Sequence, residues 1–158
     1  MKRRLWLLLI GVVLVAAFLF LRDGESEHQR AIRQVIEAGA AAVEDGDPDA
    51  LSLLIAADFR DRLGHDNKTI VRRVMSEMRP WSGLEITLDD LKIEVDQQDW
   101  TARATFRPRF QGNRQDSPEE RAGDDGPEGR RFKLTLRRYA GQWLISRGEV
   151  VFSLIDAM

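Results

Sequence analysis

The sequence predicts an α+β domain, made of three helices followed by an antiparallel sheet, behind one N-terminal membrane helix. Three observations carry this prediction. The chain opens with an uncharged apolar run from Leu5 to Leu21, apolar residues then recur at helical spacing as far as Met78, and alternating patterns typical of strands begin after Pro80. We therefore assign residues 1–24 to a signal-anchor and residues 25–158 to a single domain.

The apolar run is long enough for one membrane crossing. Its residues rise about 1.5 Å each and together reach about 26 Å, which just spans a hydrocarbon core when flanking arginines extend to the interface. Lys2, Arg3 and Arg4 precede the run, so we expect the N-terminus in the cytoplasm and the domain outside it, in the periplasm if this is a bacterial inner membrane. A cleaved secretory signal is the alternative, because VAA at residues 15–17 offers small residues at a suitable spacing.

The composition argues against several classes of function. The 24 basic and 26 acidic residues give a net charge of −2, so there is no excess of positive charge for nucleic acid. The absence of cysteine excludes disulfides, thiolate metal sites and a cysteine nucleophile. The two histidines, His28 and His65, match no zinc-binding spacing, and we expect neither a metal nor a cofactor.

Three helices are predicted before residue 80. The first covers residues 25–43 and ends at EDGDPDA, where Gly46 suits a left-handed cap and Asp47 can cap the next helix. The second runs through DALSLLIAADF, residues 49–59. The third begins after Asp66 or Asn67 and carries one apolar stripe as far as Met78.

Alternating patterns predict the strands of the sheet. They are LEITL at 84–88, LKIEV at 91–95, WTARATF at 100–106, FKLTLRRY at 132–139 and QWLISRGEVVF at 142–152. Trp100 and Trp143 fall on apolar faces of these strands, so we expect both in the core.

A solvated loop is predicted between the strands at 100–106 and 132–139, at about residues 111–131. Its only aliphatic side chain is Ala122, and its Gly, Pro and mixed charges cannot bury enough apolar surface to pack. We expect removal of Gln115 to Gly129 to leave folding intact, although a contact loop for a partner is the functional alternative.

The stretch HDN at residues 65–67 raises the question of a catalytic pair. A short polar side chain just before a helix satisfies backbone amides of the first turn, and neighbours in sequence do not face one another on a helix. We therefore interpret Asp66 or Asn67 as the helix cap and expect His65→Ala to cost little stability.

Two stretches resemble the nuclear transport factor 2-like superfamily, also described as SnoaL-like or cystatin-like α+β. They are DPDALSLLIAADFRDRLGHDNKTIVRRVM and the closing hairpin FKLTLRRYAGQWLISRGEV, within a resemblance that covers roughly residues 25–154. The resemblance implies helices packed on a strongly curved antiparallel sheet, a cone that can hold a small apolar ligand, and a sheet face used by a homodimer or protein partner. Isomerases of this kind pair an acid with a tyrosine in the cavity, whereas Tyr139 stands beside the AG turn at a sheet end.

Four residues are candidates for a site near the mouth of such a cone. Asp58 as acid or base and His65 as its partner would serve an enzyme, while Arg62 and Trp81 would bind a ligand. Alternating charges around Asp58 to Arg62 are also typical of a solvated, ion-paired surface.

These observations predict a membrane-anchored extracytoplasmic domain with a non-catalytic ligand-binding or protein-interaction role in the cell envelope. The alternative is a small cavity enzyme, an isomerase, dehydratase or hydrolase, working inside the cone.

Overall fold

The computed structural model describes residues 25–115 and 130–151. The predicted anchor from Leu5 to Leu21 and the VAA stretch at residues 15–17 lie outside these ranges. Across the described ranges, no helix combines the length and the apolar character that a membrane crossing needs.

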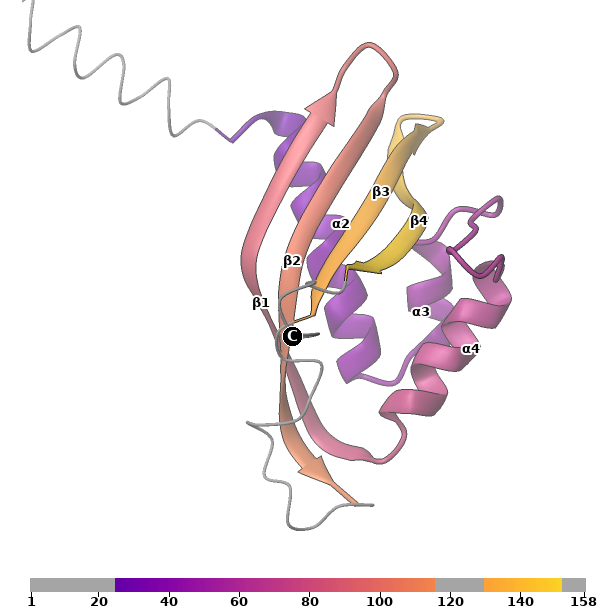
Figure 1. Ribbon diagram of the computed structural model, residues 1–158, viewed down its shortest axis with the longest axis vertical. Coiled ribbons are helices and arrows are strands. Elements are labelled where there is room, and N and C mark those ends of the chain that lie inside the picture. Colours follow the sequence, from indigo (N-terminus) through magenta and orange to yellow (C-terminus); the bar gives the residue numbers. More distant parts are fainter. Residues whose placement is uncertain (1–24, 116–129, 152–158) are drawn as a thin grey trace, which may run out of the picture.

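The described residues form an α+β fold, as the sequence predicts. The helices are α2 (Glu27–Glu44), α3 (Pro48–Leu53) and α4 (Asn67–Met78), and the strands are β1 (Trp81–Asp96), β2 (Thr101–Arg114), β3 (Arg131–Tyr139) and β4 (Gln142–Val151). The four strands pair in the order β1-β2-β3-β4, each antiparallel to the next. Figure 1 shows the long strands bending around α2, with α3 and α4 to one side.

The first helix, α2, begins with a capping box, in which Ser26 and Gln29 each accept a hydrogen bond from the other's backbone amide. The same Gln29 side chain donates to the carbonyl of Ile93 in β1 at 3.0 Å. This capping box therefore also ties the start of α2 to the sheet.

The second helix is shorter than predicted, because the residues after it join the sheet instead. α3 ends at Leu53, and the backbone of Leu54 and Ala56 then bonds to Ile145 of β4, at 2.9 Å in both directions. Arg60 adds a third such bond, to the carbonyl of Ser146. The segment 54–60 covers the outer edge of β4, and edge strands need such cover because their free amides otherwise attract other chains.

The first strand is longer than predicted. LEITL and LKIEV are two parts of β1, which is interrupted by a register irregularity between Asp89 and Lys92 where Asp90 has a φ of 54°. Strand β2 is also longer than predicted. It continues to Arg114, so residues 111–114 belong to a strand and not to the predicted loop. The β1–β2 ribbon thus extends beyond the β2–β3 pairing, which ends at Phe106 and Phe132.

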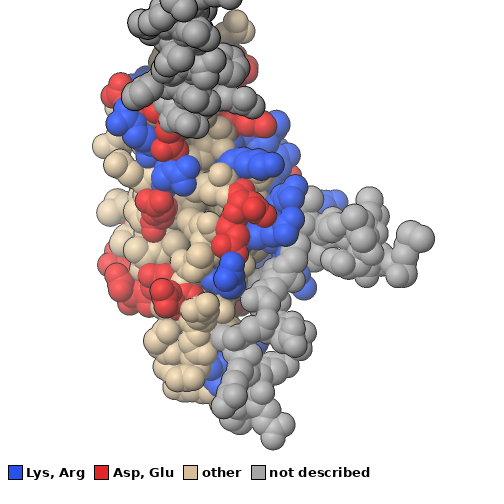
Figure 2. Space-filling view, turned by 90° about the vertical axis from the view of Figure 1, so that its left-hand side faces the viewer, with Lys and Arg blue, Asp and Glu red and all other residues tan. Residues whose placement is uncertain are grey.

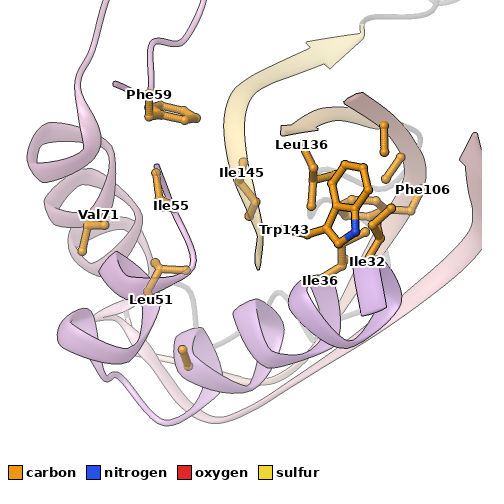
Figure 3. Close-up of a cluster of buried hydrophobic side chains, with 13 residues drawn as sticks. Ile32, Ile36, Leu51, Ile55, Phe59, Val71, Phe106, Leu136, Trp143 and Ile145 are labelled. Atoms are coloured by element: carbon orange, nitrogen blue, oxygen red, sulfur yellow. The ribbon is translucent and has the colours of Figure 1, made fainter. Parts of the chain in front are cut away.

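The core lies between α2 and the concave side of the sheet. Figure 3 shows Phe106, Leu136 and Trp143 pointing toward Ile32 and Ile36 of α2. The buried cluster comprises Ile32, Ile36, Ala42, Leu51, Ile55, Phe59, Val71, Ala102, Ala104, Phe106, Leu136, Trp143 and Ile145. Large apolar side chains buried to this degree each contribute about 1.5–3 kcal/mol to folding.

One predicted core residue lies outside this cluster. Trp143 is buried, but Trp100 is 43% exposed and stands in the β1–β2 turn with a φ of 50°. The guanidinium of Arg138 lies 4.6 Å above its ring, and His28 makes an edge contact at 5.5 Å. The alternating sequence pattern therefore includes Trp100, although β2 itself begins only at Thr101.

Candidate functional site

The candidate acid and base lie in the connection between α3 and α4. Asp58 belongs to the segment that covers β4, and His65 ends the turn just before α4. The hydrogen bonds and ion pairs of the described residues do not join Asp58 to His65. Each of the two side chains has a different partner.

The partner of His65 is Asp61, four residues earlier. Nδ1 of His65 lies 2.6 Å from Oδ2 of Asp61, and the backbone amide of His65 donates to Oδ1 at 2.7 Å. Oδ1 also accepts from the amide of Leu63, while the amide of Asp61 donates to the carbonyl of His65. Gly64, with a φ of 85°, allows the chain to close this turn around one carboxylate.

This pair has the geometry of a histidine oriented by a carboxylate. An ionised carboxylate only accepts hydrogen bonds, so the proton lies on Nδ1 and leaves Nε2 as the ring nitrogen that could act on another group. The side chains of His65 and Asp61 are 27% and 14% exposed. Burial alone would raise the pKa of Asp61, but the hydrogen bonds from His65 and Leu63 outweigh it and hold this pKa below its usual value.

Of the two predicted caps of the third helix, Asp66 and Asn67, the structure has Asp66 as the cap. Its carboxylate accepts a hydrogen bond from the backbone of Thr69 at 2.9 Å, and this contact lowers the pKa of Asp66. The side chain of Asn67 points elsewhere and donates to the carbonyls of Ser52 and Ile55. In the stretch HDN, histidine thus closes the turn, aspartate caps α4, and asparagine ties α4 to α3.

The partner of Asp58 is Tyr139. The phenolic hydroxyl donates to Oδ1 of Asp58 at 2.7 Å, and both partial burial and the nearby carboxylate raise the pKa of Tyr139. The contact joins the end of β3 to the segment beside β4. Tyr139 ends β3 beside the AG turn, as predicted, and there it forms a tyrosine–carboxylate pair with Asp58, which is exposed to solvent.

Arg62 and Trp81 lie on different parts of the fold. Arg62 is exposed in the turn before α4 and, among the described residues, forms no ion pair. Trp81 is half-buried at the start of β1, where it packs 6.4 Å from the ring of Phe110 and 5.9 Å from the guanidinium of Arg114. Ligand binding by these two residues stays a prediction.

The residues that sequence reasoning missed are Asp61 and Tyr139. Asp61 stands in the same charged stretch as Asp58, and its spacing of four from His65 is the signal that could have identified it. Tyr139 is separated from Asp58 by 81 positions, and no local pattern links them. Over residues 25–115 and 130–151, no group of three or more His, Asp or Glu side chains is arranged to hold a metal ion.

Comparisons with protein-family models and with curated proteins find no match. Solved structures do match. Aln2 from a Streptomyces species superimposes with a TM-score of 0.66 at 12% identity, over 85% of this chain and 98% of that one. A nuclear transport factor 2-like protein of unknown function from Pseudomonas putida gives 0.60 at 21% identity, over 85% and 95%.

A third match is a proposed dehydratase of the same family from Streptomyces avermitilis. It has a TM-score of 0.61 at 17% identity, over 79% of this chain and 95% of that one. At these identities the likeness concerns the fold alone. The described domain therefore has the nuclear transport factor 2-like, cystatin-like α+β fold.

Proposed function

We propose that this chain is a membrane-anchored, extracytoplasmic domain with a non-catalytic ligand-binding or protein-interaction role in the cell envelope. The observation that carries the proposal is the separation of the candidate acid and base. Asp58 is bound to Tyr139, and His65 is bound to Asp61. The first contact joins the end of β3 to the segment beside β4, and the second closes the turn before α4, so these side chains have structural roles that account for their presence.

The location rests on the apolar run from Leu5 to Leu21 and the three basic residues before it. α2 begins at Glu27, a few residues after the run, so the domain would stay close to the membrane surface. Alkaline phosphatase fused after Met158 is expected to be active. Activity from a cytoplasmic reporter alone would contradict this orientation.

The interaction role is tested by site-specific photocrosslinking in intact membranes. A photoreactive residue replaces Arg103, exposed on the sheet, and in a matched variant replaces Arg72, exposed on α4. We expect discrete crosslinked products, identified by mass spectrometry, from position 103 on the sheet face and none from position 72 on α4. Equal, unspecific products at both positions would contradict a defined interaction surface.

A small cavity enzyme of the dehydratase type is the second candidate. Two observations favour it: Asp61 orients His65 so that Nε2 is the free ring nitrogen, and one structural relative is a proposed dehydratase. In such an enzyme Nε2 would take a proton from the substrate. The crosslinking experiment changes neither Asp61 nor His65, so replacing these two residues tests the enzyme separately. If the chain is such an enzyme, the replacements should abolish turnover while the fold is retained.

A further inference from the structure

The face of the sheet that points away from the helices is divided into two electrostatic halves. Along β2, buried Ala102, Ala104 and Phe106 alternate with side chains on this outer face. On the β1–β2 half, each exposed arginine of β2 that precedes residue 110 has an acidic partner on β1. The pairs are Arg103–Glu94 at 3.7 Å, Arg107–Asp90 at 3.7 Å and Arg109–Asp89.

Figure 2 looks toward the β1 side of the molecule and shows acidic and basic side chains next to one another. Exposed pairs of this kind add little to stability, but they neutralise the surface that carries them. This half of the outer face therefore offers no net attraction for a charged partner.

The β3–β4 half differs. Strand pairing brings Arg131, Lys133, Thr135 and Arg137 of β3 onto this face, beside Arg147 and Glu149 of β4. Lys133 has Glu149 at 3.7 Å. Within the described part of the chain, Arg131, Arg137 and Arg147 form no ion pair, and all three are exposed. Arg137 also contacts the side chain of Tyr139, whose hydroxyl is bound to Asp58.

We infer that the outer face of β3–β4 binds an acidic segment of a partner protein in an extended conformation. Residues on one face of a strand recur about every 6.7 Å, and so do the side chains on one face of an extended peptide. From Arg131 to Arg137 the basic row spans about 20 Å, enough for three or four acidic side chains at this repeat. The inference rests on the proposed interaction role and names the chemistry of its partner.

Arginine suits this task because its planar guanidinium can donate two parallel hydrogen bonds to one carboxylate. Thr135 lies between Lys133 and Arg137 along β3 and pairs across the strands with Arg147, so the row has a hydroxyl at its centre and a cation beside it. An acidic peptide would therefore meet cations along both β3 and β4.

The test uses the full chain in detergent and a fluorescent peptide of eight glutamates, with a peptide of eight glutamines as the uncharged probe. The variant R131Q/R137Q/R147Q removes the three arginines of this face that form no ion pair and keeps Lys133, which is paired with Glu149. The control K68Q/R72Q/R73Q removes three exposed charges from α4 and changes the net charge equally. R131K/R137K/R147K keeps the charges and serves if the glutamine variant does not fold.

We expect the glutamate peptide to bind the wild type, the sheet variant to weaken binding at least about ten-fold, and the α4 control to change it by less than about two-fold. The lysine variant should retain binding within about ten-fold of the wild type. Equal losses in the sheet and α4 variants, or binding of polyphosphate without binding of the glutamate peptide, would overturn the inference. If the peptide does not bind, the crosslinking experiment at Arg103 still tests the interaction role, so the two proposals can fail independently.

Discussion

The polar residues between Asp58 and Asn67 each have a separate structural task. Asp58 reaches Tyr139, Asp61 closes a turn with His65, and Asp66 caps α4. A capping carboxylate satisfies amides that the first helical turn leaves without partners. These three aspartates therefore make three different kinds of contact, although they stand close together in the sequence.

Replacement of the cap gives the first prediction. Asp66→Ala is expected to lower the melting temperature by roughly 3–6 °C, because the amide of Thr69 loses its acceptor. Asp49→Ala, at an exposed position in the first turn of α3, is the control and should change it much less. Thermal unfolding followed by circular dichroism measures both, and equal shifts would contradict the cap.

The Asp61–His65 contact gives a prediction about pH. The pKa of Asp61 is lower in the folded protein than its ordinary value of 3.8, so the contact stabilises the fold above that pH and its contribution is lost as pH falls through the folded pKa. Asp61→Asn should therefore destabilise the protein more near pH 7 than at a pH below 3.8. Denaturant unfolding at both pH values measures this, and a pH-independent difference would contradict it.

The same contact changes the expectation for His65→Ala. A turn residue outside the helix stripe is expected to lose few contacts, but His65 gives the partly buried carboxylate of Asp61 one of its hydrogen bonds. We therefore expect a loss of about 1 kcal/mol, within the range measured for such bonds.

At the scale of elements, local patterns predicted what local forces determine. The α4 stripe, its cap and the alternation along the strands were all visible in the sequence, because each depends on residues within a few positions. The end of α3 was predicted wrongly, since Leu54 and Ala56 bond to Ile145 of β4, far along the chain. The Asp58–Tyr139 contact could not be predicted for the same reason.

The β1–β2 ribbon contains a glycine that no other residue can replace without strain. Gly112 has a φ of 151°, and a Cβ there would lie 3.1 Å from the carbonyl oxygens of Gly83 and Ser82. Gly112→Ala should cost about 1–3 kcal/mol, in line with strained backbone conformations. Gly46 also has a positive φ, but a Cβ there meets nothing within 4 Å, so Gly46→Ala should cost less. Equal losses of unfolding free energy in the two variants would contradict the close approach.

The connection between β2 and β3 gives a prediction about tolerance. Replacing residues 116–129 by a Gly-Ser segment of the same length is expected to change the melting temperature by less than about 2 °C, because loop composition adds little packing. Gln115 is kept, since its amide donates to the carbonyl of Pro80 at 2.9 Å. A loss of many degrees would show that the segment packs on the domain.

At the scale of the molecule, the fold and the site differ in how far the sequence specifies them. The order of three helices followed by an antiparallel sheet follows from the hydrophobic pattern, because helical spacing before Pro80 and alternation after it predict each element from nearby residues. The site depends on which exposed side chains meet across the fold. Trp100 illustrates the limit, because its alternation with Ala102 predicts a core position while a positive φ turns it toward Arg138.

The non-catalytic proposal depends on Asp58 and His65 acting in separate contacts, and two double-mutant cycles test this most directly. The cycles combine His65→Gln with Asp61→Asn and with Asp58→Asn, and denaturant unfolding gives the coupling free energy of each pair. The account predicts a coupling of about 0.5–3 kcal/mol between Asp61 and His65, and one within about 0.5 kcal/mol of zero between Asp58 and His65. A substantial coupling between Asp58 and His65 would place both in one site and contradict the proposal.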